Sequence, residues 1–179
     1  MCPSAENKNN KWAFEDQPDE YVASILGNIP SRWGRMSPLS RLLIVETGCL
    51  LQEGGILARG QRLSEINKKV GLIGGTKRGS LQADQEFIVT MAEGPGLASP
   101  SLFGYTLPNI PLAEAASFYG LVGPVYAIFD SRDPLKKAVD EARRLLVMQK
   151  GLAFMLACEF DHYGHRGQLE KLSVTLTVV

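Results

Sequence analysis

Apolar residues along the chain follow two spacings, one typical of strands and one typical of helices. Residues 70–74 and 152–158 are short, nearly continuous apolar runs, which predict buried strands. Between Ser37-Pro38 and Gly54-Gly55, leucines recur three and four positions apart, which predicts an amphipathic helix with Ser37 as its N-cap. A second amphipathic helix opens at Asp133-Pro134, and its apolar stripe consists of Leu135, Ala138, Val139, Ala142, Leu145 and Leu146.

Shorter patterns fill the intervals between these segments. Residues 81–100 predict a loop with a short helix, and residues 112–119 predict a helix that the glycines and proline of residues 120–124 end. Residues 125–129 predict a further strand. In the last segment, residues 172–179, serine and threonine alternate with apolar residues, which predicts a strand with one more polar face.

The order of these elements predicts an α/β fold. Strands that alternate with helices form βαβ units, so we expect a mixed sheet with flanking helices and an antiparallel edge strand at the end. Residues 1–20 are polar and predict a flexible N-terminal tail, while residues 21–179 form a single domain.

Composition narrows the classes of function. The chain has 179 residues, of which 45% are apolar and 21% charged, with a formal net charge of zero. The absence of a basic field argues against nucleic-acid binding and against a polybasic membrane surface. No apolar run is long enough for a bilayer span or a signal peptide, so we expect a cytoplasmic protein.

Neither the cysteines nor the glycines indicate a cofactor. No pair of cysteines has the C-x-x-C spacing of zinc or redox sites, and we expect free thiols without a disulfide framework. The glycine cluster after residue 73 lacks the spacing of nucleotide-binding loops, so it is interpreted as a tight turn that follows a buried strand. The cysteines are Cys2, Cys49 and Cys158, and the glycines are Gly74, Gly75 and Gly79.

Several short motifs occur in a specific order. They are Arg32-Trp33-Gly34-Arg35-Met36-Ser37, then Val70-Gly71-Leu72-Ile73-Gly74-Gly75-Thr76, Ser99-Pro100-Ser101-Leu102-Phe103, Asn109, and Phe118-Tyr119-Gly120-Leu121-Val122-Gly123-Pro124. In this order and spacing the chain resembles the N-terminal half of the β-ketoacyl synthases, over roughly residues 30 to 160. The resemblance implies the thiolase-like fold.

The resemblance also implies where a catalytic cysteine would stand. In that family the nucleophile begins the helix after the strand that follows "G-P", where the helix N-terminus lowers the thiol pKa and supports an oxyanion. Counted without gaps from Gly123-Pro124, Arg132 takes this position, and no cysteine lies nearby. Ser131 is interpreted as a turn or cap serine, because Asp130 and Asp133 would oppose an anionic nucleophile.

The histidines give no catalytic pair. The family's two catalytic histidines lie in its C-terminal half, and His162 and His165 are the two histidines of this chain. They follow a predicted strand, near Cys158, Glu159 and Asp161, in a segment interpreted as a solvated loop rather than a metal site. We therefore predict no catalytic residue, no metal and no cofactor.

Family members without the cysteine act as chain-length factors, which pair with an active ketosynthase and shape its acyl tunnel. The resemblance therefore implies a non-catalytic subunit of fatty-acid, polyketide or aryl-polyene-type biosynthesis. Its partner would be a full-length β-ketoacyl synthase in a heterodimer, or a second copy in a homodimer, with acyl-carrier protein as a further candidate. The predicted tunnel and partner-interface residues are Leu102, Phe103, Tyr105, Asn109, Ile128, Phe129 and Arg132.

Alternatives remain open for these residues and for the whole protein. Leu102 could equally be an ordinary core residue, and for Phe103 a position in the core is the favoured interpretation. Arg132 could pair with Asp130 or Asp133 or face solvent. The chain could be a homodimeric pseudo-enzyme that binds an acyl chain, coenzyme A or acyl-carrier protein, with Lys77, Arg78 and Arg132 as phosphate contacts. It could also be an enzyme that uses Ser131, or Cys158 paired with His162.

Overall fold

A four-stranded mixed sheet forms the centre of the computed structural model, which describes residues 19–92, 94, 96–164 and 171–179. Its strands are β1 (Val70–Thr76), β2 (Val125–Phe129), β3 (Phe154–Tyr163) and β4 (Lys171–Val178). The strand order is β2-β1-β3-β4, in which β1 pairs in parallel with β2 and β3, and β4 is antiparallel to β3. The predicted α/β class and antiparallel edge strand are confirmed.

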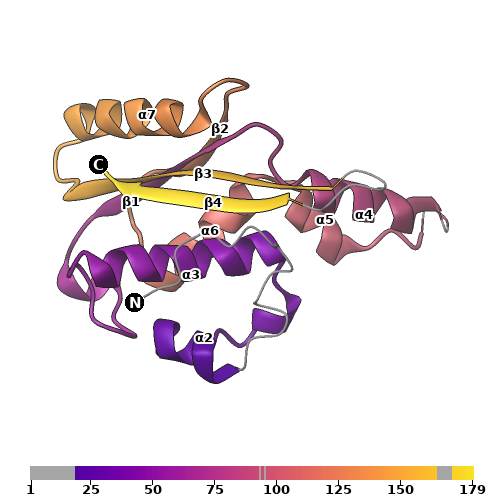
Figure 1. The fold of residues 1–179 in the computed structure, drawn as a ribbon, viewed down its shortest axis with the longest axis horizontal. Helices are drawn as coiled ribbons and strands as arrows, with labels where there is room; N and C mark the ends of the chain where they lie inside the picture. Colours follow the sequence, from indigo (N-terminus) through magenta and orange to yellow (C-terminus); the bar gives the residue numbers. More distant parts are fainter. Residues whose placement is uncertain (1–18, 93, 95, 165–170) are drawn as a thin grey trace.

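Helices cover both faces of this sheet (Figure 1). The helix α7 (Pro134–Met148) lies on one face, and α3 (Pro38–Glu53) and α6 (Asn109–Tyr119) lie on the other, with α2 (Asp19–Leu26) beyond α3. Two more helices, α4 (Leu81–Ala92) and α5 (Pro100–Thr106), lie past the carboxyl ends of β1 and β3. Two short 3-10 helices, Trp33–Arg35 and Leu63–Ile66, complete the described elements.

Two apolar clusters fill the layers between helices and sheet. The larger one joins α3 and α6 to the sheet face that carries Leu72, Leu156 and Phe160, all of which are fully buried. The smaller one joins α7 to the opposite face, through Ile73 and Ala157. Each buried leucine or phenylalanine contributes about 1.5–3 kcal/mol, so the α3 and α6 side supplies most of the apolar stabilisation.

Close packing explains two of the glycines, and backbone conformation explains a third. A Cβ on Gly75 would overlap the carbonyl oxygen of Pro134, so this glycine lets the first turn of α7 approach β1. On the other face, the Tyr119 hydroxyl donates to the carbonyl oxygen of Ile44 at 2.7 Å. A Cβ on Gly48 would overlap that hydroxyl, so Gly48 opens the space through which α6 reaches the backbone of α3. Gly79 has φ +59° and turns the chain after β1.

The predicted helix caps are confirmed at both amphipathic helices. Ser37 accepts from the Ser40 N–H at 3.2 Å at the start of α3, and Asp133 accepts from the Lys136 N–H at 3.1 Å at the start of α7. The α6 helix ends at Gly120, which adopts the left-handed conformation with φ +67°.

Several predicted boundaries are wrong. The α4 helix has 12 residues where the sequence suggested mostly loop, and α2 was not predicted. The β3 strand continues to Tyr163 instead of ending at Cys158, because β4 pairs with it along its whole second half. Cys49 is buried and disulfide-bonded, so the expectation of free thiols fails there, whereas Cys158 is a free, buried thiol.

Of the described residues, none belong to a helix long and apolar enough to cross a membrane.

Candidate functional site

The turn between β2 and α7 is organised by a carboxylate of the chain itself. Asp130 Oδ1 accepts hydrogen bonds from the backbone N–H groups of Asp133 and Arg132, each at 2.8 Å. These two donors, that of Asp133 first, lower the pKa of Asp130 below its ordinary value. Asp133 in turn caps α7. In this turn the N–H groups of Arg132 and Asp133 are therefore bound by a carboxylate of the chain itself.

Arg132 and Ser131 both lie on the outside of this turn. Both are exposed, and the ion pairs of the described part of the chain do not include Arg132 with Asp130 or Asp133. Of the alternatives for Arg132, exposure to solvent is the one that the structure shows. Ser131 has no histidine or other base among its hydrogen-bond partners in the described residues, so the turn offers no activated nucleophile.

A second carboxylate organises the turn between β1 and α4. Asp161 Oδ1 accepts from the Thr76 hydroxyl at 2.6 Å and from the backbone N–H groups of Arg78 at 2.7 Å, Gly79 at 2.9 Å and Lys77 at 3.2 Å. Asp161 is 4% exposed. This ring of N–H groups is the kind of nest that binds phosphate, but Asp161 occupies it.

The Arg78 side chain of the same turn packs on an aromatic ring. The Arg78 guanidinium lies 4.5 Å from the ring centroid of Tyr163, in cation–π geometry. With Asp161 in the nest and Arg78 on Tyr163, the turn is closed to coenzyme A or carrier-protein phosphate at its backbone. This arrangement agrees with the interpretation of the glycine cluster after residue 73 as a structural turn.

The predicted interface residues of β2 lie at an edge of the sheet. Within the described chain, β2 pairs with β1 alone, so its other side is open. Phe129 is 69% exposed at the end of the strand, and Ile128 is half-buried against the α7 side. Asn109, the first residue of α6, reaches this open edge, where its Oδ1 accepts from the Ala127 N–H at 2.7 Å.

The α5 helix carries three more predicted residues, which differ in their exposure. Phe103 is 55% exposed and contacts the ring of Phe87 at 5.4 Å between centroids, so its interpretation as a core residue is wrong. Leu102 is half-buried, and Tyr105 is 8% exposed. The Tyr105 hydroxyl donates to Glu114 at 3.1 Å, and burial, followed by the charge of Glu114, raises the pKa of Tyr105.

Leu102 and Tyr105 share a small pocket of about 170 Å³. It lies between the start of α3, the helices α4 and α5, and the end of β3, and His162 is one of its walls. His162 is 3% exposed and belongs to β3, so the predicted solvated loop is wrong at this residue. His165 lies outside the described residues.

The Cys158 and His162 pair of the enzyme alternative does not form. Both residues lie on β3, four positions apart, which separates them by about 13 Å along a strand. Cys158 is fully buried in the larger apolar cluster, and burial raises the pKa of its thiol. A neutral, inaccessible thiol is a poor nucleophile.

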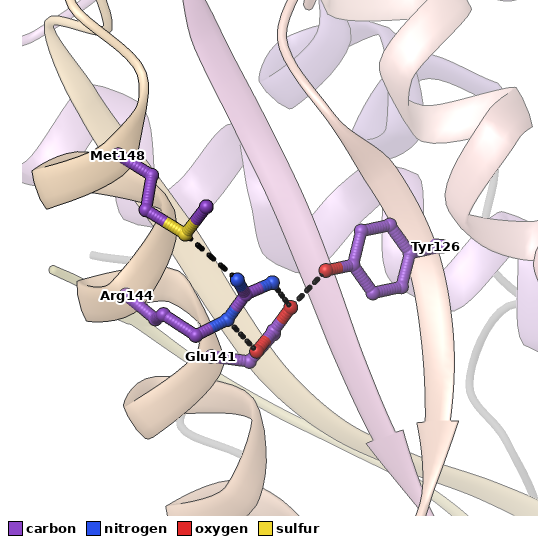
Figure 2. A network of polar contacts seen from close by, with 4 residues as sticks. All are labelled: Tyr126, Glu141, Arg144 and Met148. Carbon is purple, nitrogen blue, oxygen red and sulfur yellow. Dashed lines mark hydrogen bonds and ion pairs between the residues drawn. The ribbon is translucent and has the colours of Figure 1, made fainter.

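A polar network that the sequence did not predict fastens α7 to β2 (Figure 2). Arg144 binds Glu141 through two hydrogen bonds, of 2.6 and 2.7 Å, and donates to the Met148 sulfur. Tyr126 on β2 donates to the same Glu141. Arg144 first, and then Tyr126, lower the pKa of Glu141 to about 2. The Glu141–Arg144 spacing of three is visible in the sequence, whereas the contact with Tyr126 depends on the tertiary fold.

Comparison with known proteins agrees with this architecture. The model of the β-ketoacyl synthase N-terminal domain family matches residues 3–129. No curated protein matches the chain.

Three solved structures share the fold. They are the ishigamide ketosynthase/chain length factor (21% identity over 80% of this chain, TM-score 0.62), the ketosynthase ApeO in complex with its chain length factor ApeC from Xenorhabdus doucetiae (18% over 75%, TM-score 0.53), and a β-ketoacyl synthase from Burkholderia phymatum STM815 (17% over 77%, TM-score 0.59). The matched region is 38%, 50% and 33% of those chains, respectively, so this chain spans half of their length or less. Because the family model covers more than half of the chain, this protein belongs to the β-ketoacyl synthase N-terminal domain family.

Proposed function

We propose that this protein is a non-catalytic, chain-length-factor-type subunit that pairs with an active β-ketoacyl synthase and shapes its acyl tunnel. The proposal places it in the cytoplasm, in a fatty-acid, polyketide or aryl-polyene-type pathway. Membership of the ketosynthase family supports the general assignment. Two of the similar structures, the ishigamide ketosynthase/chain length factor and ApeO with its chain length factor ApeC, support the specific type of subunit.

The observation that carries the proposal is the turn before α7. A ketosynthase needs a thiolate there, stabilised by the helix N-terminus. In this chain the N–H groups of Arg132 and Asp133 are bound by the Asp130 carboxylate, and Asp133 caps the helix. Two carboxylates already occupy this turn, and their charges disfavour a further anion, which supports a role without chemistry at this position.

Exposed apolar side chains support a role in pairing. Leu97 and, at the end of α7, Val147 and Met148 are exposed large apolar residues outside the proposed interface. Other large apolar residues with at least 49% exposure lie on α4, on α5 and its end, and on β2 and its lead-in, and exposed apolar patches are typical of protein interfaces. Asn109 connects these regions, because it follows α5 by three residues and binds β2. These residues are Ile88, Val89, Met91, Phe103, Leu107, Val122 and Phe129.

The proposed mechanism is steric. A tunnel gains about 0.8 kcal/mol for each methylene group that it buries, and it loses this gain when a side chain closes its end. Since about 1.4 kcal/mol corresponds to tenfold selectivity, one or two methylene groups would be enough to set the chain length of the product. Leu102 is the residue that we place at the tunnel end, with Phe103 and Tyr105 as its bulky neighbours.

Light scattering after size-exclusion chromatography tests the pairing. The chain is measured alone and after co-expression with each candidate ketosynthase of the same source, and a one-to-one complex is expected with one of them. Product length is then compared between the wild-type pair and pairs that carry Leu102→Ala or, as a control on the same helix, Ser101→Ala. Longer products with Leu102→Ala alone are the expected result.

A stable homodimer that binds none of the ketosynthases would overturn the proposal. The protein would then be the alternative, a pseudo-enzyme that holds an acyl chain, coenzyme A or acyl-carrier protein. Occupation of the β1–α4 nest by Asp161 counts against phosphate binding at Lys77 and Arg78, so an acyl ligand alone would be the first to test in that case.

A further inference from the structure

The pocket beside Leu102 lies near the carboxyl ends of the parallel strands β1 and β3, the end at which α/β proteins bind ligands. Its walls come from the lead-in and start of α3, from α4, from α5 and from the end of β3. Its volume of about 170 Å³ is slightly larger than the roughly 150 Å³ cavity that holds one benzene molecule in another protein. The pocket therefore has room for a group the size of a small ring.

Polar side chains stand among the apolar walls of this pocket. His162 is the most buried of them, with 3% exposure, and its backbone N–H donates to the Gly79 carbonyl oxygen at 2.8 Å, which holds it in place on β3. Ser37 and Ser101 are further polar walls, and Leu102 is an apolar one. A plain hydrocarbon group would displace water from the polar walls without replacing its hydrogen bonds, whereas a hydroxyl or carbonyl group replaces them.

Charged ligands are not favoured in this pocket. Arg35 and Glu86 are both exposed and both line it. An anion therefore meets the carboxylate of Glu86, and a cation meets the guanidinium of Arg35. A neutral group avoids both repulsions.

Two helices begin at the pocket, but capping serines bind part of their N-terminal donors. Both α3 and α5 begin with a proline, which has no N–H. Ser37 Oγ accepts from the Ser40 N–H at 3.2 Å, and Ser99 Oγ accepts from the Leu102 N–H at 3.3 Å. Capped helix starts attract an anion less than uncapped ones do, so a carboxylate or phosphate gains little here.

We propose that this pocket is a subsite for the distal end of the acyl chain, and that it selects an uncharged end group with a hydroxyl or carbonyl over a plain hydrocarbon end. This inference rests on the proposed function, which puts Leu102 at the end of the tunnel. Leu102 is half-buried and is also a wall of the pocket, so in this arrangement it separates the tunnel from the pocket. One net hydrogen bond corresponds to roughly a 2- to 10-fold change in an equilibrium constant, which sets the expected selectivity.

The selectivity is tested first on the wild-type chain alone, by NMR titration with benzene, phenol and benzoate. The backbone amides of Leu102 and His162 report binding at the pocket. Phenol is expected to bind roughly 2- to 10-fold more tightly than benzene, and benzoate more weakly than phenol. Because water solvates the hydroxyl group, an apolar pocket would give the opposite order for phenol and benzene. The proposal fails if benzene binds as tightly as phenol, if benzoate binds most tightly, or if none of the three binds.

Two variants locate the site. Ser101 is exposed on α5, so Ser101→Trp should fill the pocket from its rim and weaken phenol binding about tenfold or more. Its control is Ala113→Trp, at an exposed position of α6 outside the pocket, which should bind phenol like the wild type. Equal binding by the two variants would overturn the proposal.

His162→Phe keeps an aromatic ring and removes both ring nitrogens, so the preference for phenol over benzene should disappear. An unchanged preference in this variant would contradict the role of His162. If the buried substitution prevents folding, the wild-type titrations and Ser101→Trp still decide the proposal.

A second measurement uses the pair with its ketosynthase. Leu102→Ala should open the tunnel to the pocket. Turnover of an acyl thioester with a terminal hydroxyl should then rise roughly 2- to 10-fold more than turnover of the plain acyl thioester of the same length. An equal rise for both substrates would overturn the proposal.

The two hypotheses fail in different ways. If phenol binds as expected but no ketosynthase pairs with the chain, the selectivity of the pocket stands and the proposed function fails. If a ketosynthase pairs with the chain but benzene binds as tightly as phenol, the proposed function stands and the inference about the pocket fails.

Discussion

Two turns at the carboxyl ends of the parallel strands have the same design and different surroundings. After β1, the Asp161 carboxylate accepts from three backbone N–H groups and a hydroxyl, and it is buried. After β2, the Asp130 carboxylate accepts from two backbone N–H groups at the surface, next to the sheet edge. Carboxyl ends of parallel strands are where α/β proteins bind ligands. In this chain both places are filled by its own acids, one inside the fold and the other at the proposed interface.

The largest difference between the two turns should appear when their acids are removed. Asp161→Ala leaves the N–H groups of Lys77 and Arg78 and the Thr76 hydroxyl without their acceptor, whereas the Gly79 N–H keeps the Thr76 oxygen at 2.6 Å. We expect the free energy of unfolding to fall by about 3 kcal/mol. Asp161→Asn keeps one oxygen acceptor and should cost less. Urea denaturation followed by circular dichroism measures both. If Asp161→Ala were as stable as the wild type, the hydrogen bonds between Asp161 and the β1–α4 nest would not stabilise the fold.

The next largest effect is expected on the affinity for the ketosynthase. The ketosynthase should contact the β2 edge of the sheet and not the opposite edge, which is β4. Phe129→Glu places a charge on a side chain that is 69% exposed, and we expect it to weaken the complex with the ketosynthase about tenfold or more. Its matched control is Val178→Glu, on the other edge strand, where the side chain is 42% exposed. Isothermal titration calorimetry measures both, and equal weakening by the two variants would contradict this assignment of the interface.

A third acid, Glu46 on α3, differs from Asp161 and Asp130. Among the described residues, no hydrogen-bond donor to the Glu46 carboxylate is present. Burial, and then the charge of Glu53, raise the pKa of Glu46 to about 7 from the ordinary 4.5. The folded protein therefore binds more protons than the unfolded chain between these values, and stability falls as the pH rises through this window. Partial exposure limits the effect to about 1 kcal/mol.

Glu46→Gln should remove this pH dependence. Its free energy of unfolding should exceed that of the wild type by about 1 kcal/mol at pH 8 and match it at pH 4. The exposed Glu20→Gln is the control. Chemical denaturation at the two pH values measures the difference, and an equal gain at both would show that the charge of Glu46 is not the cause.

The smallest effect is expected at the exposed turn. The lowered pKa of Asp130 means that its contribution to stability is present above the ordinary pKa of an aspartate and is lost as the pH falls through the lowered value. Because the hydrogen bonds of this carboxylate lie at the surface, Asp130→Asn should change the melting temperature by no more than about 2 °C at pH 7. Differential scanning calorimetry measures this, and a loss as large as that of Asp161→Ala would remove the distinction between the two turns.

The sequence predicted the elements with strong periodicity and missed what depends on tertiary contacts. The α3 and α7 helices follow from leucine spacing and capping residues, and β1 and β2 follow from apolar runs. The end of β3 was missed because Asp161 and His162 are polar residues that tertiary contacts bury. A local sequence pattern assigns such polar residues to a loop. They belong to a strand because Asp161 binds the nest after β1 and because this part of β3 pairs with β4.

The candidate site shows the same limit. Motif order placed Leu102, Asn109, Phe129 and Arg132 in positions that the structure finds at or near one edge and one end of the sheet. The sequence could not indicate that Asn109 binds the Ala127 N–H, since that contact joins residues 18 positions apart through a helix start and a strand edge. Phe103 was misjudged because apolar character alone does not distinguish a core from an interface.

The contact between Gly48 and Tyr119 has a consequence for how this family can diverge. The Tyr119 hydroxyl occupies the space where a side chain at position 48 would begin. Alanine at position 48 therefore fits better beside phenylalanine than beside tyrosine at position 119, because only the ring Cζ, 3.2 Å from the added Cβ, then remains close. We expect a larger side chain at position 48 to be accompanied by loss of the hydroxyl at position 119.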